Sequence, residues 1–249
     1  MVDVWEDRSF AFDTALRVGR VLLGLLISAI AGVTILHPSR GFAQTCSGQN
    51  LTTTPASPPN PRSYDLYSKQ LHSVVSADVD LILLGDSLAE YWDSKLFPPI
   101  NVVNLGVAGD KTQNVLWRLD TDEWSKLRPR AVFIMLGTNN LPFDKPCAVV
   151  AGLKKVIKRV KSIWPPAQVV LLEITPRGKD FLEYNSSRVE INAEMHSVPG
   201  LKTVNVDDEI TCGWQQESAS GPCPNYTDNL HFSAAGYAII RKHLALFGK

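Results

Sequence analysis

The chain has 249 residues, of which 45% are hydrophobic and 20% are charged, and this composition suits one globular domain with appendages and excludes a disordered or fibrous protein. Lys plus Arg and Asp plus Glu both number 25, so the formal net charge at pH 7 is zero. No overall charge draws the protein to nucleic acid or to an anionic membrane surface, and we expect neither kind of partner on this ground.

The N-terminal segment has the features of a secretory signal. Arg17 and Arg20 precede an apolar run over residues 21–36, and the small residues Gly41 and Ala43 follow it. We therefore predict a signal peptide over residues 1–43 and a secreted or periplasmic mature chain. An uncleaved anchor is the alternative, and only then would the membrane be a partner. The run is shorter than the roughly 20 apolar residues that a spanning helix prefers.

Residues 44–63 differ in composition from the rest of the chain. They are rich in Thr, Ser, Asn and Pro, with prolines at positions 55, 58, 59 and 61. This composition predicts an extended linker or arm. The folded domain would then span residues 64–249.

Beyond the linker, short apolar runs alternate with helix-like stretches. Near-continuous apolar runs of this length are typical of parallel strands buried on both faces, and they lie at 79–84, 102–105, 131–136, 169–172 and 202–206. Helices are predicted at 112–119, 147–164, 182–197 and 234–247. This alternation predicts an α/β fold: a three-layer α/β/α sandwich around a five-stranded parallel sheet in flavodoxin-like order. Ligands of such sheets bind outside the carboxyl ends of the strands, so the residues that follow each strand are the functional candidates.

A serine follows the first predicted strand, in the tripeptide Gly85-Asp86-Ser87. A hydroxyl at a tight strand-to-helix turn is well placed to act as a nucleophile at the sheet edge. Taken alone, the tripeptide is more simply explained as a turn with a helix cap, because Asp and Ser are favoured there.

Hydrogen-bond donors follow the next two predicted strands. Gly106, in Asn104-Leu105-Gly106, offers a backbone N–H, and Asn139, in Gly137-Thr138-Asn139-Asn140, offers a side-chain amide. Together with the N–H of Ser87 they predict an oxyanion hole of three donors. Gly and Asn are also common in ordinary turns, but the order and placement of these three favour the catalytic interpretation.

Asp228 and His231 stand three positions apart near the C-terminus. In a helical or turn-like segment such residues share a side, so the Asp228 carboxylate can orient one nitrogen of His231 while the other faces elsewhere. His231 would then accept the hydroxyl proton of Ser87. The alternative is a structural Asp–His pair in a surface loop. The sequence contains no cluster with metal-ligand spacing and no nucleotide-binding glycine motif, so we predict no metal and no cofactor.

All four cysteines lie after the proposed cleavage point, where disulfides persist in exported proteins. Four cysteines permit three pairings. We favour Cys212 with Cys223, which are close in sequence across a loop, and this leaves Cys46 with Cys147. Four free thiols are the alternative, and a zinc site is less favoured because no C-x-x-C pair occurs.

The motifs in this order and spacing resemble the four blocks of the SGNH (GDSL-type) hydrolases: Gly85-Asp86-Ser87, Asn104-Leu105-Gly106, Gly137-Thr138-Asn139 and Asp228-Asn229-Leu230-His231. Within that family the catalytic subunits of platelet-activating factor acetylhydrolase and their bacterial relatives are similar at Gly109-Asp110-Lys111-Thr112, Leu116-Trp117-Arg118-Leu119 and Thr175-Pro176-Arg177-Gly178. The resemblance implies a three-layer fold, a Ser87, Asp228 and His231 triad, and an oxyanion hole of Ser87, Gly106 and Asn139. It also implies a preference for short acyl groups, acetyl above all. The export signal and the cysteines depart from the intracellular acetylhydrolase subunits.

These observations predict an exported serine esterase that forms an acyl-enzyme on a small-molecule, polysaccharide or lipid ester. On the same fold, an O-acyltransferase, a lysophospholipase or a thioesterase is the alternative. A catalytically inactive carbohydrate- or lipid-binding module is the alternative from another class, since fold and motif do not guarantee function. The sequence leaves open whether the chain forms a homodimer.

Overall fold

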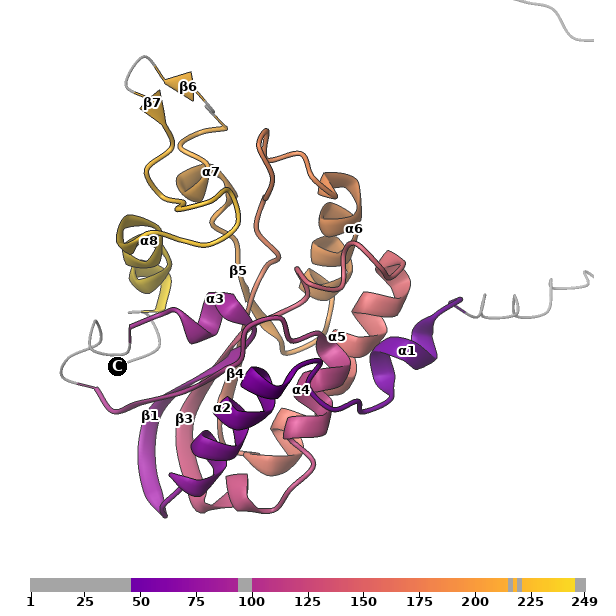
Figure 1. Ribbon diagram of the computed structural model, residues 1–249, viewed down its shortest axis with the longest axis vertical. Helices are drawn as coiled ribbons and strands as arrows, with labels where there is room; N and C mark the ends of the chain where they lie inside the picture. The colour runs from indigo at the N-terminus through magenta and orange to yellow at the C-terminus, as the bar shows by residue number, and fades with distance from the viewer. Residues whose placement is uncertain (1–45, 94–99, 215–216, 219–220, 245–249) are drawn as a thin grey trace, which may run out of the picture. The chain divides into compact units, whose positions relative to one another are not determined.

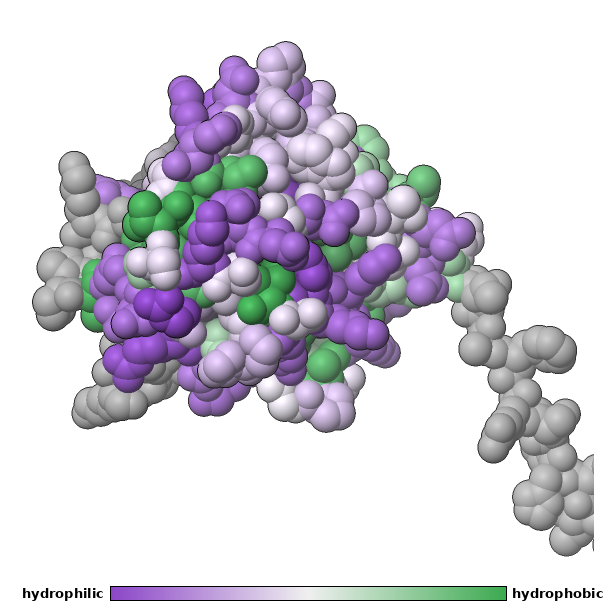
Figure 2. All heavy atoms as spheres, turned by 90° about the horizontal axis from the view of Figure 1, so that it is seen from below, coloured by the Kyte–Doolittle hydropathy of each residue, from purple (hydrophilic) through white to green (hydrophobic). Residues whose placement is uncertain are grey.

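The computed structural model describes residues 46–93, 100–214, 217–218 and 221–244. The predicted signal peptide over residues 1–43 lies outside this part of the chain. Among the described helices, none is both long and apolar enough to cross a bilayer. Seen from below, the described surface is mostly hydrophilic, with apolar residues in separate areas (Figure 2).

A five-stranded sheet lies at the centre of the domain, and its strands run in the order β2-β1-β3-β4-β5. All of its pairings are parallel. The strands are β1 (Ala77–Gly85), β2 (Val102–Gly106), β3 (Leu127–Met135), β4 (Gln168–Leu172) and β5 (Lys202–Val204). The predicted three-layer α/β/α fold with a flavodoxin-like sheet is confirmed.

Two hydrophobic cores form because alternate residues of each strand face opposite sides of the sheet. On β1, Ile82 and Leu84 belong to one core and Leu81 and Leu83 to the other. The first core is covered by α2 (Pro61–His72), α4 (Thr112–Arg118), α5 (Pro146–Ile163) and α6 (Asn185–His196). The second is covered by α3 (Ser87–Glu90), α7 (Asp207–Ile210) and α8 (Ala234–Leu244). Figure 1 shows the two helical layers on either side of the strands.

Several boundaries differ from the predicted ones for local reasons. Helix α6 begins at Asn185 instead of position 182, because Tyr184 has a left-handed backbone with φ 56°. Strand β3 begins at Leu127, where its first residues pair with the start of β1 although Arg128 and Arg130 are exposed. The short 3₁₀ helix η2 (Glu123–Lys126) precedes it, and a two-stranded hairpin of β6 (Glu217–Ser218) and β7 (Gly221–Pro222) lies apart from the main sheet.

The segment predicted as an extended linker at 44–63 is anchored to the domain by helices and by two buried residues, Thr52 and Ser63, although most of its described residues are exposed. It contains α1 (Gln49–Thr53), and Thr52 is fully buried with its hydroxyl donating to the Ala148 carbonyl oxygen at 2.6 Å. Helix α2 begins at Pro61, inside the predicted linker, because the Asn60 side chain caps it by accepting from the Ser63 amide at 2.9 Å. A composition rich in proline does not distinguish a free linker from a strap, a segment that runs along the surface of the domain and packs on it.

Both predicted disulfides are present, Cys46–Cys147 and Cys212–Cys223, with no free cysteine. The first joins the N-terminal strap, residues 46–60, to the start of α5. The second closes a short loop beside α7 and the approach to Asp228.

Candidate active site

Ser87 lies directly after β1, at the carboxyl edge of the sheet. Strand β1 approaches β3 so closely at Gly85 that a Cβ there would lie 1.8 Å from the Met135 carbonyl oxygen, so the position requires glycine. Asp86 then caps α3 by accepting from the Leu88 amide at 2.9 Å. Ser87 is therefore the first residue of a short helix in a sharp turn, and it is only 3% exposed.

The structure brings Ser87, His231 and Asp228 into one hydrogen-bonded chain. His231 Nε2 lies 3.0 Å from Ser87 Oγ, and His231 Nδ1 lies 2.7 Å from Asp228 Oδ2. With the proton on Nδ1, His231 donates to the Asp228 carboxylate and its Nε2 accepts from the Ser87 hydroxyl. This is the arrangement of a nucleophile, a general base and an orienting carboxylate.

The Asp228 carboxylate is also held by its own turn. Its Oδ1 accepts from the amides of Leu230 at 3.2 Å and His231 at 2.7 Å. Partial burial alone would raise the pKa of Asp228, but the hydrogen bonds from the His231 ring and backbone outweigh it and lower this pKa. Asp228 therefore stays ionised and can stabilise a protonated His231.

Three hydrogen bonds, to two neighbouring segments, hold the loop that carries Asp228 and His231. The Gly178 amide donates to the Asn229 carbonyl oxygen at 2.9 Å, and the Tyr226 hydroxyl donates to the Pro176 carbonyl oxygen at 2.8 Å. The Asn225 side chain donates to the Glu209 carbonyl oxygen at 3.0 Å. His231 is thus held against Ser87 by the segment after β4 and by α7.

Asn139 lies beyond the end of β3, and its side-chain amide donates to the Asp110 carbonyl oxygen at 3.0 Å. An amide nitrogen carries two hydrogens, so this bond orients the group and leaves one N–H to bind a ligand. Gly106 does not fit the role predicted for it. Its amide donates to Asn104 Oδ1 at 2.9 Å, and a Cβ there would lie 2.1 Å from the Glu90 nitrogen. The Gly106 amide is therefore already hydrogen-bonded, and the glycine allows β2 to pack closely against α3.

Gly109 has the properties that Gly106 lacks. It has φ 84°, and a Cβ built there would meet nothing within 4 Å. Within the described residues its amide has no hydrogen-bond partner. The turn 107–110 lies against β1 through a bond from the Val107 amide to the Gly85 carbonyl oxygen at 3.0 Å, and against Asn139 through Asp110. The prediction missed Gly109 as a donor, although the glycine itself is visible in Gly109-Asp110-Lys111-Thr112.

A buried ion pair fixes the far side of this turn. Asp110 accepts from the Arg118 guanidinium at 2.7 Å, and both side chains are almost fully buried. Arg118 also donates to the carbonyl oxygens of Leu105 at 3.0 Å and Gly85 at 3.2 Å. Burial raises the pKa of Asp110 to about 6, although the Arg118 charge opposes the rise. One side chain thus joins the ends of β1 and β2 to the turn.

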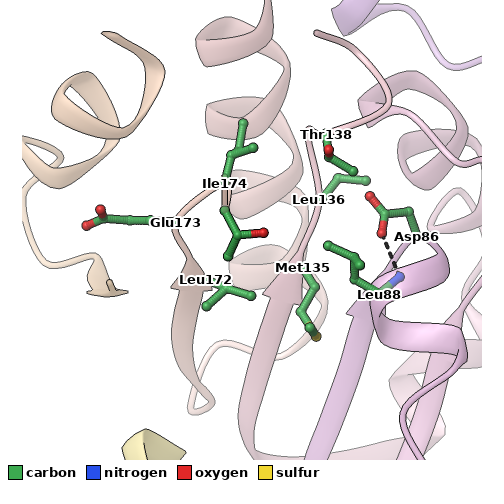
Figure 3. A pocket seen from close by; sticks show the side chains of 9 residues that line it. Asp86, Leu88, Met135, Leu136, Thr138, Leu172, Glu173 and Ile174 are labelled. Atoms are coloured by element: carbon green, nitrogen blue, oxygen red, sulfur yellow. Dashed lines mark hydrogen bonds between the residues drawn. The ribbon is translucent and has the colours of Figure 1, made fainter. Parts of the chain in front are cut away.

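A small pocket lies at the carboxyl ends of β1, β3 and β4, with Asp86, Leu88 and Thr138 among its lining residues (Figure 3). One Asp86 oxygen accepts from Leu88, as Figure 3 shows, and the other is buried without a partner in the described part of the chain. Burial raises the pKa of Asp86 to about 7. Tyr91, which sequence reasoning also missed, is half exposed, and its ring centroid lies 5.1 Å from that of His231.

No group of three or more His, Cys, Asp or Glu side chains is placed to hold a metal ion among the described residues.

The comparisons with known proteins agree with this geometry. Residues 83–239 match the model of the GDSL-like Lipase/Acylhydrolase family. The chain is 30% identical over 172 residues to platelet-activating factor acetylhydrolase IB subunit alpha2 of Rattus norvegicus, covering 66% of this chain and 74% of that protein. It is 30% identical over 208 residues to subunit alpha1 of Pongo abelii, covering 76% of this chain and 87% of that protein.

Solved structures agree in fold. The crystal structure of a GDSL-like lipase from Bacteroides thetaiotaomicron is similar with a TM-score of 0.58 and 17% identity, covering 74% of this chain and 95% of that chain. The family match spans β1 to α8 and includes the nucleophile turn, both donor segments and the Asp228–His231 loop. The chain belongs to the GDSL-like lipase/acylhydrolase family and is a carboxylic ester hydrolase.

Proposed function

We propose that the protein is an exported serine esterase that hydrolyses short-chain acyl esters, with Ser87 as nucleophile, His231 as general base and Asp228 as the orienting carboxylate. The observation that carries the proposal is the hydrogen-bonded chain from Ser87 Oγ through His231 to Asp228, with distances of 3.0 and 2.7 Å. Ser87 and His231 are 144 positions apart in sequence, so the fold is what brings them together.

The proposed reaction runs through an acyl-enzyme. Ser87 Oγ attacks the ester carbonyl carbon while His231 Nε2 takes the hydroxyl proton, and the protonated His231 then gives that proton to the leaving alcohol. A water molecule, deprotonated by His231 in the same way, attacks the acyl-enzyme and releases the acid. Asp228 holds the ring and stabilises its protonated form at each step.

The proposed oxyanion hole consists of the Ser87 amide, the Gly109 amide and the free N–H of the Asn139 side chain. Gly109 replaces Gly106 because its amide has no hydrogen-bond partner among the described residues and a Cβ there would meet nothing within 4 Å, whereas the Gly106 amide donates to Asn104. Asn139 and Gly109 are coupled, since Asn139 is oriented by the carbonyl oxygen of the residue after Gly109. Preorganised donors of this kind are usually the largest single contribution to acyl transfer.

The proposed preference for acetyl and other short acyl groups is supported by the acetylhydrolase names of the relatives. Export is supported by the two disulfides, because such bonds persist in oxidising compartments. The substrate in the names of the relatives is stated of those proteins and is not assigned to this chain.

A panel of p-nitrophenyl esters tests the proposal, with acetate, butyrate and longer chains assayed beside acetylated sugars and lysophospholipids. We expect the highest kcat/KM on acetate and no turnover by Ser87→Ala on any ester. Adding an alcohol acceptor separates hydrolysis from O-acyl transfer. Ester binding without turnover by wild-type protein would identify a binding module instead and contradict the proposal.

A further inference from the structure

The turn that carries Gly109 is held at Ala108 by hydrogen bonds with side chains from α2 and α3. The Ala108 amide donates to Glu90 Oε2 at 2.6 Å, and the Ala108 carbonyl oxygen accepts from Ser63 Oγ at 3.3 Å. Both polar groups of the residue before Gly109 are therefore held by side chains. The Ala108 carbonyl shares a planar peptide unit with the Gly109 amide, and the Ala108 amide belongs to the preceding unit, so the two bonds together fix the orientation of the Gly109 amide.

Glu90 is placed on the turn by the helix that begins with Ser87. Helix α3 packs directly on the end of β2, since a Cβ at Gly106 would lie 2.1 Å from the Glu90 nitrogen. The Glu90 side chain is 14% exposed, and Arg62 of α2 donates to both of its carboxylate oxygens. Arg62 itself is 61% exposed. A chain of contacts thus runs from Arg62 through Glu90 to the Ala108 amide.

A carboxylate close to an oxyanion hole is electrostatically unfavourable, because it repels the negative charge that develops in the transition state. The Glu90 carboxylate must therefore make a favourable interaction that offsets this repulsion. Glu90 supplies a charged acceptor for the Ala108 amide, and a hydrogen bond to an ionised group is shorter and stronger than a neutral one. Arg62 supplies the positive charge that cancels the repulsion.

We propose that Glu90 is a positioning residue for the oxyanion hole, which orients the Gly109 amide through Ala108, and that Arg62 is the counter-ion that makes its charge tolerable there. This inference rests on the proposed function, in which Gly109 is an oxyanion donor. Within the described residues the Glu90 side chain forms no hydrogen bond or ion pair with Ser87, Asp228 or His231. Its loss should therefore act on kcat and leave KM nearly unchanged.

The first test compares Glu90→Ala with Glu90→Gln on p-nitrophenyl acetate. Glu90→Ala removes the acceptor, and because small misplacements of catalytic groups cost up to about 100-fold, we expect kcat to fall about 10- to 100-fold. Glu90→Gln keeps an acceptor oxygen and should recover most of kcat. Glu123→Ala is the matched control, since Glu123 forms an exposed ion pair with Lys126 at the amino end of β3.

The second test separates the charge of Arg62 from its packing. Arg62→Ala should lower kcat in the wild-type background, where it leaves the Glu90 charge uncompensated. In the Glu90→Gln background the same substitution should have little effect, because there is no charge to offset. An equal loss in both backgrounds would overturn the counter-ion role.

Hydrogen exchange of the Ala108 amide gives a readout that does not depend on turnover. We expect faster exchange in Glu90→Ala than in wild-type protein or Glu90→Gln. The inference is overturned if Glu90→Ala keeps wild-type kcat, changes only KM, or leaves Ala108 exchange unaltered. Equal inactivity of wild-type protein and Ser87→Ala would overturn the proposed function instead, and Ala108 exchange would still decide whether Glu90 holds the turn.

Discussion

The two halves of the site are built in different ways. Ser87, Asn139 and Gly109 lie beyond the carboxyl ends of the neighbouring strands β1, β3 and β2, where Ser87 is 3% exposed and the buried Asp110–Arg118 pair ties the ends of β1 and β2 to the turn. Asp228 and His231 lie on a loop, and their side chains are 55% and 24% exposed. The nucleophile half gains its rigidity from the core, whereas the base half depends on hydrogen bonds with neighbouring loops. In the proposed mechanism, proton transfer requires Ser87 Oγ and His231 Nε2 to stay about 3 Å apart.

The largest expected effect comes from removing one member of either half. Ser87→Ala and His231→Ala should each lower kcat by about 10⁶, as in a serine protease where the triad acts as a unit. The double variant should be scarcely worse than either single variant, since both fail at the same step. Asp228→Asn should lose less, up to about 10⁴, because it affects orientation and charge and leaves the attacking atom in place.

These values are measured as kcat/KM on p-nitrophenyl acetate, with circular dichroism confirming that each variant is folded. Wild-type turnover in folded Ser87→Ala would falsify the mechanism. Multiplicative losses in the double variant would show that the two halves act independently.

The disulfides support different halves and enclose loops of very different length. Removing Cys46–Cys147, which spans 101 residues, should lower the free energy of unfolding by about 4.7 kcal/mol, and removing Cys212–Cys223, which spans 11, by about 2.8 kcal/mol. Paired Cys→Ala variants in urea melts give both values. Below the unfolding transition, loss of Cys212–Cys223 should reduce kcat more, since it borders the loop that carries the base. The reverse order in kcat would contradict the comparison of the two halves.

Within the nucleophile half, one donor can be removed without touching the triad. Asn139→Ala should lower kcat by about 10²–10³, or roughly 3–4 kcal/mol of transition-state stabilisation, with little change in KM. Stopped-flow measurement of acylation at saturating ester tests this step directly. A change confined to KM would mean that Asn139 binds ground state and transition state equally.

The smallest effect concerns the buried Asp86 carboxyl beside the nucleophile. The pKa of Asp86 is about 7 in the folded chain and near 3.8 when unfolded. At pH values between these two pKa values, the folded state keeps a proton on Asp86 that the unfolded state has released. The free energy of unfolding should therefore fall by about 2 kcal/mol as the pH rises from 5 to 7. Asp86→Asn keeps an acceptor for Leu88 and should remove this part of the pH dependence. Urea melts at pH 5 and pH 7 measure it, and identical slopes for both proteins would refute it.

Local patterns were enough to predict much of this molecule. Apolar runs predicted all five strands of the main sheet, because strands buried on both faces must be apolar throughout. The pairing of Cys212 with Cys223 followed from closeness in sequence. The Asp228–His231 contact also followed from local spacing, because a turn three residues long brings those side chains together whatever surrounds them.

The packed strap at residues 46–60 and the choice between Gly106 and Gly109 could not be predicted in this way. Gly106 is the last residue of β2 and Gly109 lies three residues later, and nothing in the local sequence shows which of them offers its amide. The difference arises because α3 lies against Gly106 and Asn104 takes its amide, while the next turn leaves Gly109 open. The strap looked like a linker because the groups that bind Thr52 lie far away in sequence, on α4 and α5.

The sequence by itself therefore determined the α/β class, the serine at a strand end and the Asp–His pair, since these depend on the order of residues along one segment. Only the tertiary structure decided that His231 reaches Ser87 across 144 positions of sequence, which glycine has an amide without a hydrogen-bond partner among the described residues, and that Glu90 and Ser63 hold the turn at Ala108. Such contacts join residues that are distant in sequence, and their geometry is set by how helices pack on the sheet.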